Sequence, residues 1–112
     1  QLSLTKDEIA NINTAVTAYN SAIASLASSY GIGLVDANAK MKELGASSGI
    51  LYDGVKYTAT FVTGGSFSLD GVHLTGRGYA IIANEFIKAI NSKYGSTLPN
   101  VNPNSYSGVK FP

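Results

Sequence analysis

A long amphipathic segment near the start of the chain, residues 5–30, constrains the fold more than any other feature. Its apolar residues recur in alternating steps of three and four, which places them on one face of an α-helix. They are Ile9, Ile12, Val16, Tyr19, Ile23, Leu26 and Tyr30. Thr5 and Glu8 have the spacing of a capping box, and Gly31 suits the left-handed residue that ends a helix. We therefore expect a helix that buries one whole face.

The same spacing also suits a coiled coil. A coiled-coil seam is flanked by charged residues over three to four heptads, whereas the flanks of this segment are Asn, Thr, Ser and Ala. We therefore favour packing of the helix on a sheet or core over a coiled-coil seam.

The composition excludes several classes of protein. The chain has 112 residues, 45% of them hydrophobic and 13% charged, which fits one domain and argues against disorder. The net charge is +1 with scattered basic residues, so no footprint for nucleic acid is present. No apolar run approaches the roughly 20 residues of a membrane-spanning helix. The absence of cysteine removes disulfides and thiolate metal sites, and the start at Gln1 without a signal peptide indicates a processed or truncated product.

The segment after the first helix predicts an α/β fold. The sequence IGLVDAN, residues 32–38, is typical of a short buried strand, and residues 39–45 predict a short helix that ends at Gly45. A buried parallel strand needs a neighbour on each side, and the sequence contains only one such strand. We therefore expect an incomplete architecture.

A hairpin and a second long helix follow. Asp53 and Gly54 lie between ILY and VKY, and this two-residue pattern predicts a tight hairpin because both central residues must tolerate positive φ. Thr75 is the expected N-cap of the second helix and Gly95 its terminator. The apolar stripe of this helix consists of Tyr79, Ile82, Ala83, Phe86, Ile90 and Tyr94.

The last residues form a tail that we include in a single domain spanning residues 1–112. Residues 96–112 are rich in Pro, Asn and Ser, which predicts an extended path over the surface. We expect Tyr106, Val109 and Phe111 to hold this tail in place.

The sequence SLDGVHLTGRGY, residues 68–79, contains the only histidine. An imidazole becomes a general base when a carboxylate holds one nitrogen and the other faces the group to be deprotonated. Asp70 and His73 can reach this geometry within one turn if Gly71 supplies a tight bend. The dipole of the following helix favours a nearby anion. From spacing alone, however, the pair is more typical of a polar surface turn.

A wider stretch of sequence changes that interpretation. The segment FSLDGVHLTGRGYAIIANEFIKAIN resembles the last conserved block of the GDSL (SGNH) hydrolases, in which an Asp-Gly-x-His turn precedes a Thr or Ser and a Gly-Tyr helix. AYNSAIASLASSYGIGLVDA looks like the penultimate helix and last parallel strand of that family. The resemblance thus covers most of the chain. Many members carry Pro where this chain has Leu74, which is a loop difference.

The resemblance implies the C-terminal portion of a serine ester hydrolase with a three-layer α/β/α, flavodoxin-like sheet. This portion comprises two long helices, one buried parallel strand and a β-hairpin insertion. The resemblance gives His73 the role of general base and later general acid, and it gives Asp70 the role of orienting that imidazole. No cofactor is implied, and the substrate is an ester.

Other parts of the family's active site have no counterpart in this sequence. The nucleophilic serine belongs to a Gly-Asp-Ser motif and an oxyanion-hole asparagine to a Gly-x-Asn-Asp motif, and the chain contains neither. We therefore expect both groups in a missing N-terminal part and no esterase activity from this chain alone. Two apolar helix faces and an open strand edge predict pairing with that missing half or with a second copy.

The remaining polar candidates have plainer interpretations. Ser66 and Ser68 are favoured for local turn hydrogen bonds over the role of substitute nucleophile. Arg77 can contact an anionic substrate, but an exposed residue in the first helical turn is the simpler expectation. Asp36 ends the predicted strand, where α/β proteins place their sites, yet we favour it as a helix cap. The Asp-x-x-His pair lacks the further ligands that a metal site needs.

A competing hypothesis is a binding or structural module that keeps the hydrolase scaffold without its chemistry. The encoded sequence upstream of Gln1 separates the two hypotheses. Gly-Asp-Ser and Gly-x-Asn-Asp motifs there support the enzyme, and a genuine start at this point supports the module.

Overall fold

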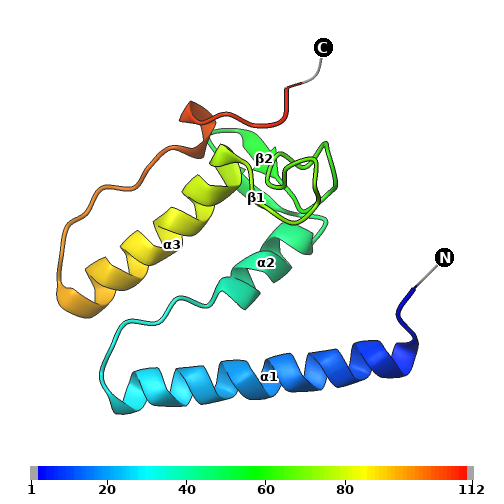
Figure 1. The fold of residues 1–112 in the computed structure, drawn as a ribbon. Coiled ribbons are helices and arrows are strands. Elements are labelled where there is room, and N and C mark those ends of the chain that lie inside the picture. Colours follow the sequence, from blue (N-terminus) through cyan, green and yellow to red (C-terminus); the bar gives the residue numbers. More distant parts are fainter. Residues whose placement is uncertain (1–2, 111–112) are drawn as a thin grey trace. The chain divides into compact units, whose positions relative to one another are not determined.

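The computed structural model describes residues 3–110, which fall into two compact units that divide between Leu34 and Val35 (Figure 1). The described part of the first unit contains one helix, α1 (Lys6–Ser29). The second unit contains α2 (Ala37–Gly45), β1 (Ile50–Tyr52), β2 (Val55–Tyr57), α3 (Gly76–Tyr94) and the 3₁₀ turn η1 (Pro103–Ser105). The chain thus combines helices with one antiparallel hairpin, which is compatible with an α/β class.

Helix α1 begins and ends as its sequence predicts. The Thr5 hydroxyl accepts from the Glu8 N–H at 3.3 Å, and the Glu8 carboxylate accepts from the Thr5 N–H at 2.7 Å, so the capping box is confirmed. Gly31 follows the helix with φ +63°. Nothing within the described residues of this unit covers the apolar face, where Tyr19 is 69% and Tyr30 77% exposed. The described part of this unit contains no second element that could cover the face.

The buried parallel strand predicted after α1 is also absent. Residues 32–36 are irregular and belong to no ladder of the described chain, and Ile32 and Leu34 are exposed. A parallel strand is held by hydrogen bonds to strands on both sides, and between residues 3 and 110 the only ladder is the β1–β2 hairpin. The apolar run therefore has no sheet to join.

The β1–β2 hairpin confirms the turn prediction. Tyr52 faces Val55 and Ile50 faces Tyr57 in an antiparallel register. The two turn residues have positive φ, +45° at Asp53 and +79° at Gly54, as a two-residue turn of this type requires.

The core of the second unit is small and joins three elements. Leu44 from α2, Tyr57 from β2 and Ile81 from α3 are at most 1% exposed and form one apolar cluster. Partly buried neighbours pack against it, namely Met41, Ile50, Tyr52 and Ala59. The Ala59 N–H donates to the Leu44 carbonyl at 2.7 Å, which ties the end of the hairpin to α2.

Helix α3 has the predicted ends but buries a different face. The Thr75 hydroxyl accepts from the Gly78 N–H at 3.1 Å, and Gly95 closes the helix with φ +66°. The predicted apolar stripe is largely exposed, including Tyr79, Phe86 and Tyr94. The buried residues of α3 are Gly78, Ala80, Ile81 and Asn84. Ile81 packs in the core cluster. Gly78 lies against the backbone of the loop before the helix, where a Cβ would have no room, and Asn84 hydrogen-bonds to the backbone of the tail.

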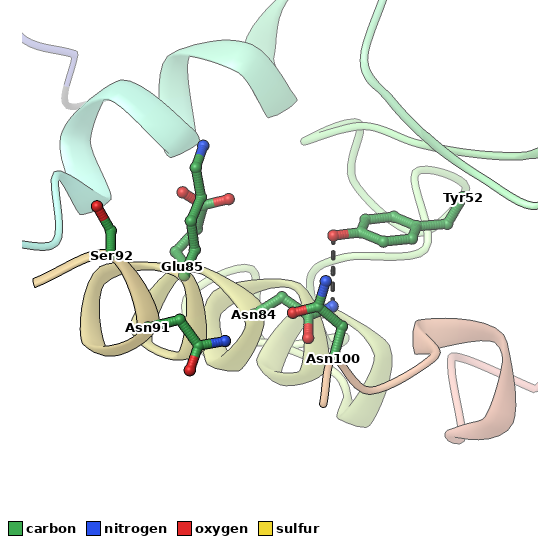
Figure 2. Close-up of a pocket in the computed structure, with 7 residues that line it drawn as sticks. Tyr52, Asn84, Glu85, Asn91, Ser92 and Asn100 are labelled. Carbon is green, nitrogen blue, oxygen red and sulfur yellow. Dashed lines mark hydrogen bonds between the residues drawn. The ribbon is translucent and has the colours of Figure 1, made fainter. Parts of the chain in front are cut away.

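Side-chain amides fasten the tail to α3. Asn84 donates to the Val101 carbonyl and accepts from the Val101 N–H, both at 2.8 Å, and it also donates to the Tyr52 hydroxyl at 3.3 Å (Figure 2). Asn91 makes the same two-way contact with Leu98, with both distances 2.9 Å. Each of these two side-chain amides satisfies one backbone N–H and one backbone carbonyl of the tail, as a neighbouring strand would do in a sheet.

The residues expected to hold the tail do so only in part. The side chain of Tyr106 is exposed, and its carbonyl is the group that is held, by Arg77 Nε at 2.9 Å. Val109 is half-buried, and Phe111 lies outside the described residues. Asn104 binds the Tyr52 carbonyl and the Tyr57 hydroxyl, so the 3₁₀ turn η1 sits on the hairpin. The tail is extended as predicted, but polar contacts hold it.

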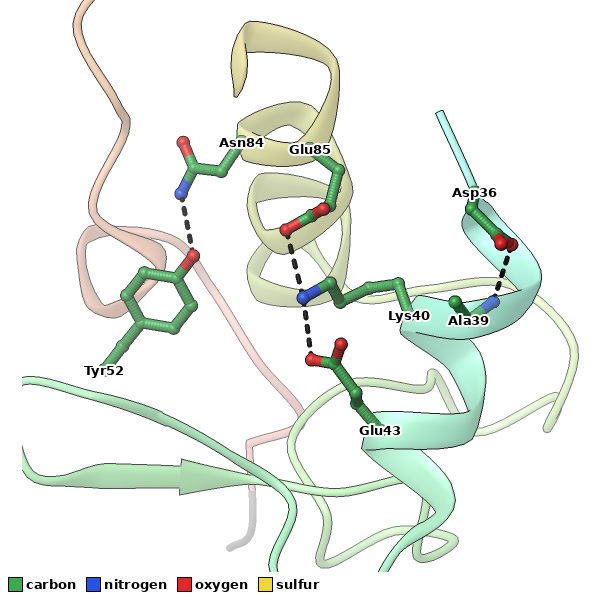
Figure 3. A network of polar contacts seen from close by, with 7 residues as sticks. All are labelled: Asp36, Ala39, Lys40, Glu43, Tyr52, Asn84 and Glu85. Atoms are coloured by element: carbon green, nitrogen blue, oxygen red, sulfur yellow. Dashed lines mark hydrogen bonds and ion pairs between the residues drawn. The ribbon is translucent and has the colours of Figure 1, made fainter. Parts of the chain in front are cut away.

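An ion cluster joins α2 to α3. The Lys40 ammonium lies 2.7 Å from a Glu43 oxygen and 3.0 Å from a Glu85 oxygen (Figure 3). Partial burial acts to lower the pKa of Lys40, but its hydrogen bonds to Glu43 and Glu85 outweigh this and raise that pKa above the ordinary value. The lysine therefore stays charged between two carboxylates and links the helices.

Candidate active site

The Asp-x-x-His turn stands on a short antiparallel pairing of residues 66–68 with residues 73–75. The Thr75 N–H donates to the Ser66 carbonyl at 2.9 Å, and the Ser68 N–H donates to the His73 carbonyl at 2.8 Å. Gly71 adopts φ +70°, as the tight bend requires, and its N–H donates to the Ser68 carbonyl at 3.0 Å. The chain therefore reverses sharply just before α3 begins, and the turn projects from the helix N-terminus.

Asp70 is the centre of this turn. Its Oδ1 accepts from the Ser68 hydroxyl at 2.6 Å and from the backbone N–H groups of Val72 and His73 at 2.9 Å each. Its Oδ2 lies 2.6 Å from His73 Nδ1. The Ser68 hydroxyl first, and then the Val72 N–H and the two His73 groups, hold the pKa of Asp70 far below its usual range. Asp70 is therefore a carboxylate at any pH near neutrality.

The contact between Asp70 Oδ2 and His73 Nδ1 also fixes the tautomer and the orientation of the His73 imidazole. A carboxylate can only accept, so Nδ1 carries the proton of this hydrogen bond, and Nε2 is the acceptor in the neutral ring. The His73 side chain is 71% exposed, and Nε2 has no partner within residues 3–110. The arrangement presents an oriented nitrogen that can take a proton from a group brought to it.

The two serines near the turn differ from each other. The Ser68 hydroxyl makes the predicted local hydrogen bond, to Asp70. The prediction is wrong for Ser66, whose hydroxyl is fully buried and has no partner in the described chain. Neither hydroxyl contacts His73.

Asp36 and Arg77 are occupied by structural contacts. Asp36 Oδ1 accepts from the Ala39 N–H at 2.8 Å, which confirms it as the cap of α2 (Figure 3). Arg77 is half-buried, and its guanidinium donates to the Tyr106 carbonyl and packs over Gly108. The expectation of an exposed arginine is therefore wrong, because the returning tail covers this first turn of α3.

The tail also forms one wall of a groove beside Asp70. The groove has a volume of about 550 Å³ and is lined by Ser68, Leu69, Asp70, Thr75 and Gly76 on one side and residues 107–109 on the other. The sequence interpretation missed residues 107–109. Their composition predicts an extended path, but nothing in their pattern specifies which loop that path meets.

Two other observations bear on the kind of site. Among residues 3–110, no group of three or more histidine, aspartate or glutamate side chains is placed to hold a metal ion. None of the helices described is long and apolar enough to cross a membrane.

A comparison with known families identifies the chain. The model of a family described as GDSL-like Lipase/Acylhydrolase matches residues 2–86, a stretch that includes the hairpin, the Asp70–His73 turn and the first half of α3. No curated protein and no solved structure is significantly similar to the chain. Since the family match spans most of the 112 residues, the chain belongs to the GDSL-like lipase/acylhydrolase family.

Proposed function

We propose that this chain supplies the general base and the orienting acid of a serine ester hydrolase. Membership of a lipase and acylhydrolase family supports a hydrolytic function. The 2.6 Å contact between Asp70 Oδ2 and His73 Nδ1 is the observation that carries the proposal, because it leaves Nε2 free on an oriented ring.

In the proposed reaction, His73 moves the proton twice. Nε2 accepts the hydroxyl proton of a serine as that serine attacks the ester carbonyl, and the resulting imidazolium is stabilised by the ionised Asp70. The imidazolium then gives the proton to the departing alcohol. A water molecule repeats the sequence on the acyl-serine, which releases the acid and restores the serine.

The serine and the oxyanion hole come from outside this chain in our proposal. The sequence has neither a Gly-Asp-Ser nor a Gly-x-Asn-Asp motif. The hydroxyls of Ser66 and Ser68, the serines nearest to the turn, are buried and bound to Asp70, respectively. The exposed apolar faces of α1 and α3 also favour a partner segment, which we take to be the N-terminal part of the parent enzyme.

Hydrolysis of a nitrophenyl ester tests the proposal. We expect no turnover above buffer from the purified chain. A longer encoded polypeptide that includes an upstream Gly-Asp-Ser segment should be active, and His73→Ala in it should remove that activity. Asp36→Asn serves as the matched control, since Asp36 caps α2 and stands outside the turn. Robust hydrolysis by the 112-residue chain alone, abolished by His73→Ala, would overturn the claim that the nucleophile is missing.

A further inference from the structure

A second cavity lies far along α3 from the Asp70–His73 turn. It has a volume of about 630 Å³ and lies where β1, α3 and the tail meet (Figure 2). Its α3 residues run from Asn84 to Ser92, so they lie 9 to 17 positions beyond Thr75. At about 1.5 Å per residue, that is roughly 13 to 25 Å along the helix axis. The cavity is therefore separate from the proposed catalytic pair.

The walls of this cavity are held rigid by contacts already described. Asn84 and Asn91 use both ends of their amides on the tail backbone, at Val101 and Leu98. Their amides fix the distance between helix and tail and have little capacity left for a ligand. These hydrogen bonds preserve the shape of the cavity, because the tail cannot move away from α3 without breaking four of them.

Other lining groups remain available. The side chains of Lys88, Ser92 and Asn100 have no partner within the described chain. Glu85 binds Lys40 through Oε1, which leaves Oε2 as a free acceptor. The Tyr52 hydroxyl accepts from Asn84 and keeps its own O–H to donate. The cavity thus offers unused donors and acceptors from three separate segments.

The charges of these groups indicate the kind of ligand. Glu85 and Lys88 have opposite signs, and Lys40 is held between Glu43 and Glu85, so no excess of either sign attracts a phosphate or a metal cation. The free groups mix neutral donors and acceptors beside the aromatic ring of Tyr52. A neutral polyhydroxylated molecule matches this mixture, because each of its hydroxyls can both donate and accept a hydrogen bond. The C–H groups of such a molecule can also pack against the face of the Tyr52 ring. The volume lies in the range typical of small-ligand sites.

We propose that this cavity binds a neutral sugar unit. Asn100 and Ser92 bind its hydroxyls from the tail and from α3, Glu85 Oε2 accepts from one hydroxyl, and the Tyr52 ring forms one wall. The inference does not depend on the proposed hydrolase chemistry, since it uses none of the groups of the Asp70–His73 turn.

An NMR titration of the ¹⁵N-labelled 112-residue chain tests this site. The probes are the neutral disaccharides cellobiose, xylobiose and maltose, with inorganic phosphate and glycerol as comparisons. We expect at least one disaccharide to shift the amide signals of residues 84–92 and 100–101, with a dissociation constant on the order of millimolar, as is usual for a small polar ligand. Phosphate and glycerol should leave these signals in place.

Two variants make the test specific. Asn100→Ala combined with Ser92→Ala should weaken sugar binding at least tenfold, and the rest of the spectrum should be preserved because neither side chain has an internal partner. His73→Ala should leave the affinity for the sugar unchanged. Sugar binding is therefore tested independently of the proposed role of His73 in hydrolysis. The proposal is overturned if no disaccharide shifts the signals at ~50 mM, which is about 50-fold above the expected dissociation constant of ~1 mM. It is also overturned if phosphate binds more tightly than the disaccharides at this cavity, or if the double variant binds sugar as well as the unaltered chain does.

Discussion

Asp70 holds His73 at two points, the backbone and the ring. Oδ1 accepts from the His73 N–H at 2.9 Å and Oδ2 lies 2.6 Å from Nδ1. One carboxylate therefore fixes the ring relative to its own backbone, although the His73 side chain is 71% exposed. The orientation of this imidazole is a property of the turn itself and does not need a surrounding pocket.

Replacement of Asp70 by Asn should release that orientation. An amide can present its N–H₂ group as well as its oxygen to Nδ1, so the preference for a protonated Nδ1 is lost. ¹⁵N NMR of neutral His73 should show Nε2 unprotonated in the unaltered chain and a mixture of tautomers in Asp70→Asn. In an active longer polypeptide, kcat should fall by about 10²- to 10⁴-fold, by analogy with triads of this type.

Ser68→Ala provides the matched control for that change. It removes one hydrogen bond to Asp70 but leaves the carboxylate against Nδ1. The tautomer preference should persist and kcat should fall by less than about tenfold, a loss of about 1.4 kcal/mol or less. A single Nε2-unprotonated tautomer in Asp70→Asn would contradict the role assigned to the carboxylate.

The low pKa of Asp70 also predicts an acid dependence of stability. The folded-state pKa lies below the unfolded value of about 3.9, so the carboxylate stabilises the fold at pH values above about 4. That contribution is lost as the pH falls from about 4 toward the folded-state pKa. Urea unfolding between pH 6 and pH 2 should show a constant difference between the unaltered chain and Asp70→Asn above about pH 5, and a shrinking difference below it.

The difference in stability between the unaltered chain and Asp70→Asn isolates the contribution of the Asp70 carboxylate. Glu8 also has a lowered pKa, caused by its hydrogen bonds to the Thr5 N–H and hydroxyl, but it is the same in both proteins and cancels in the difference. Stability curves that stay parallel down to pH 2 would show that the contacts of Asp70 do not favour its ionised form in the folded state.

Gly78 should be indispensable for the packing of α3 beneath the Asp70–His73 turn. A Cβ at this position would lie 2.2 Å from the Ser66 carbonyl oxygen and 3.0 Å from Leu74 Cβ. Gly78→Ala gains about 1 kcal/mol of helix propensity, but the clash with backbone forces a shift that costs about 1–3 kcal/mol or more. We expect a net loss in the free energy of unfolding, measured by urea denaturation, together with disturbed signals from residues 66–75.

Gly45→Ala is the control for that experiment. Gly45 ends α2 and has no atom within 4 Å of its would-be Cβ, so the same change there should be neutral or slightly stabilising. Equal stability of the two variants would show that the contact between Gly78 and Ser66 is not tight in solution.

Local features of this chain could be predicted from its sequence because they depend on neighbouring residues. The capping box of Thr5, the Asp53–Gly54 turn and the Asp36 cap each involve contacts within three residues. The closeness of Asp70 and His73 is of the same kind, since a bend at Gly71 is enough to bring them together. The family match confirms the resemblance to the GDSL family. It was that resemblance, and not the spacing of Asp70 and His73, that suggested a catalytic role for the pair.

Long-range features could not be predicted, because they depend on which surfaces meet. The apolar stripes of α1 and α3 were expected to be buried, yet the described chain leaves both largely exposed. Asn84 was not singled out at all, although it is 4% exposed and holds the tail. A single asparagine within a helical segment is a weak signal, and its role becomes visible only once Val101 lies beside it.

Asn84 should accordingly be the main anchor of the tail. Asn84→Ala leaves the Val101 N–H and carbonyl without their partners in a partly buried place, where each unsatisfied group costs about 1–3 kcal/mol. We expect a drop of at least about 1 kcal/mol in the free energy of unfolding. Amide hydrogen exchange at Val101 should become much faster. Asn91→Ala, whose contacts with Leu98 are exposed, should cost less and leave the exchange at Val101 slow.

The exposed apolar stripes predict that the isolated chain associates with itself. Tyr19 on α1 and Phe86 on α3 are 69% and 52% exposed, and each belongs to a row of large apolar side chains. Soluble monomers rarely expose such contiguous surface, because its removal from water is favourable. Light scattering after size exclusion should show a mass that rises with protein concentration. Tyr19→Lys combined with Phe86→Lys should shift the chain toward monomer, whereas Lys110→Ala, a change outside both rows, should not. A stable monomer of the unaltered chain across that concentration range would remove the main support that the exposed faces give to a missing partner segment.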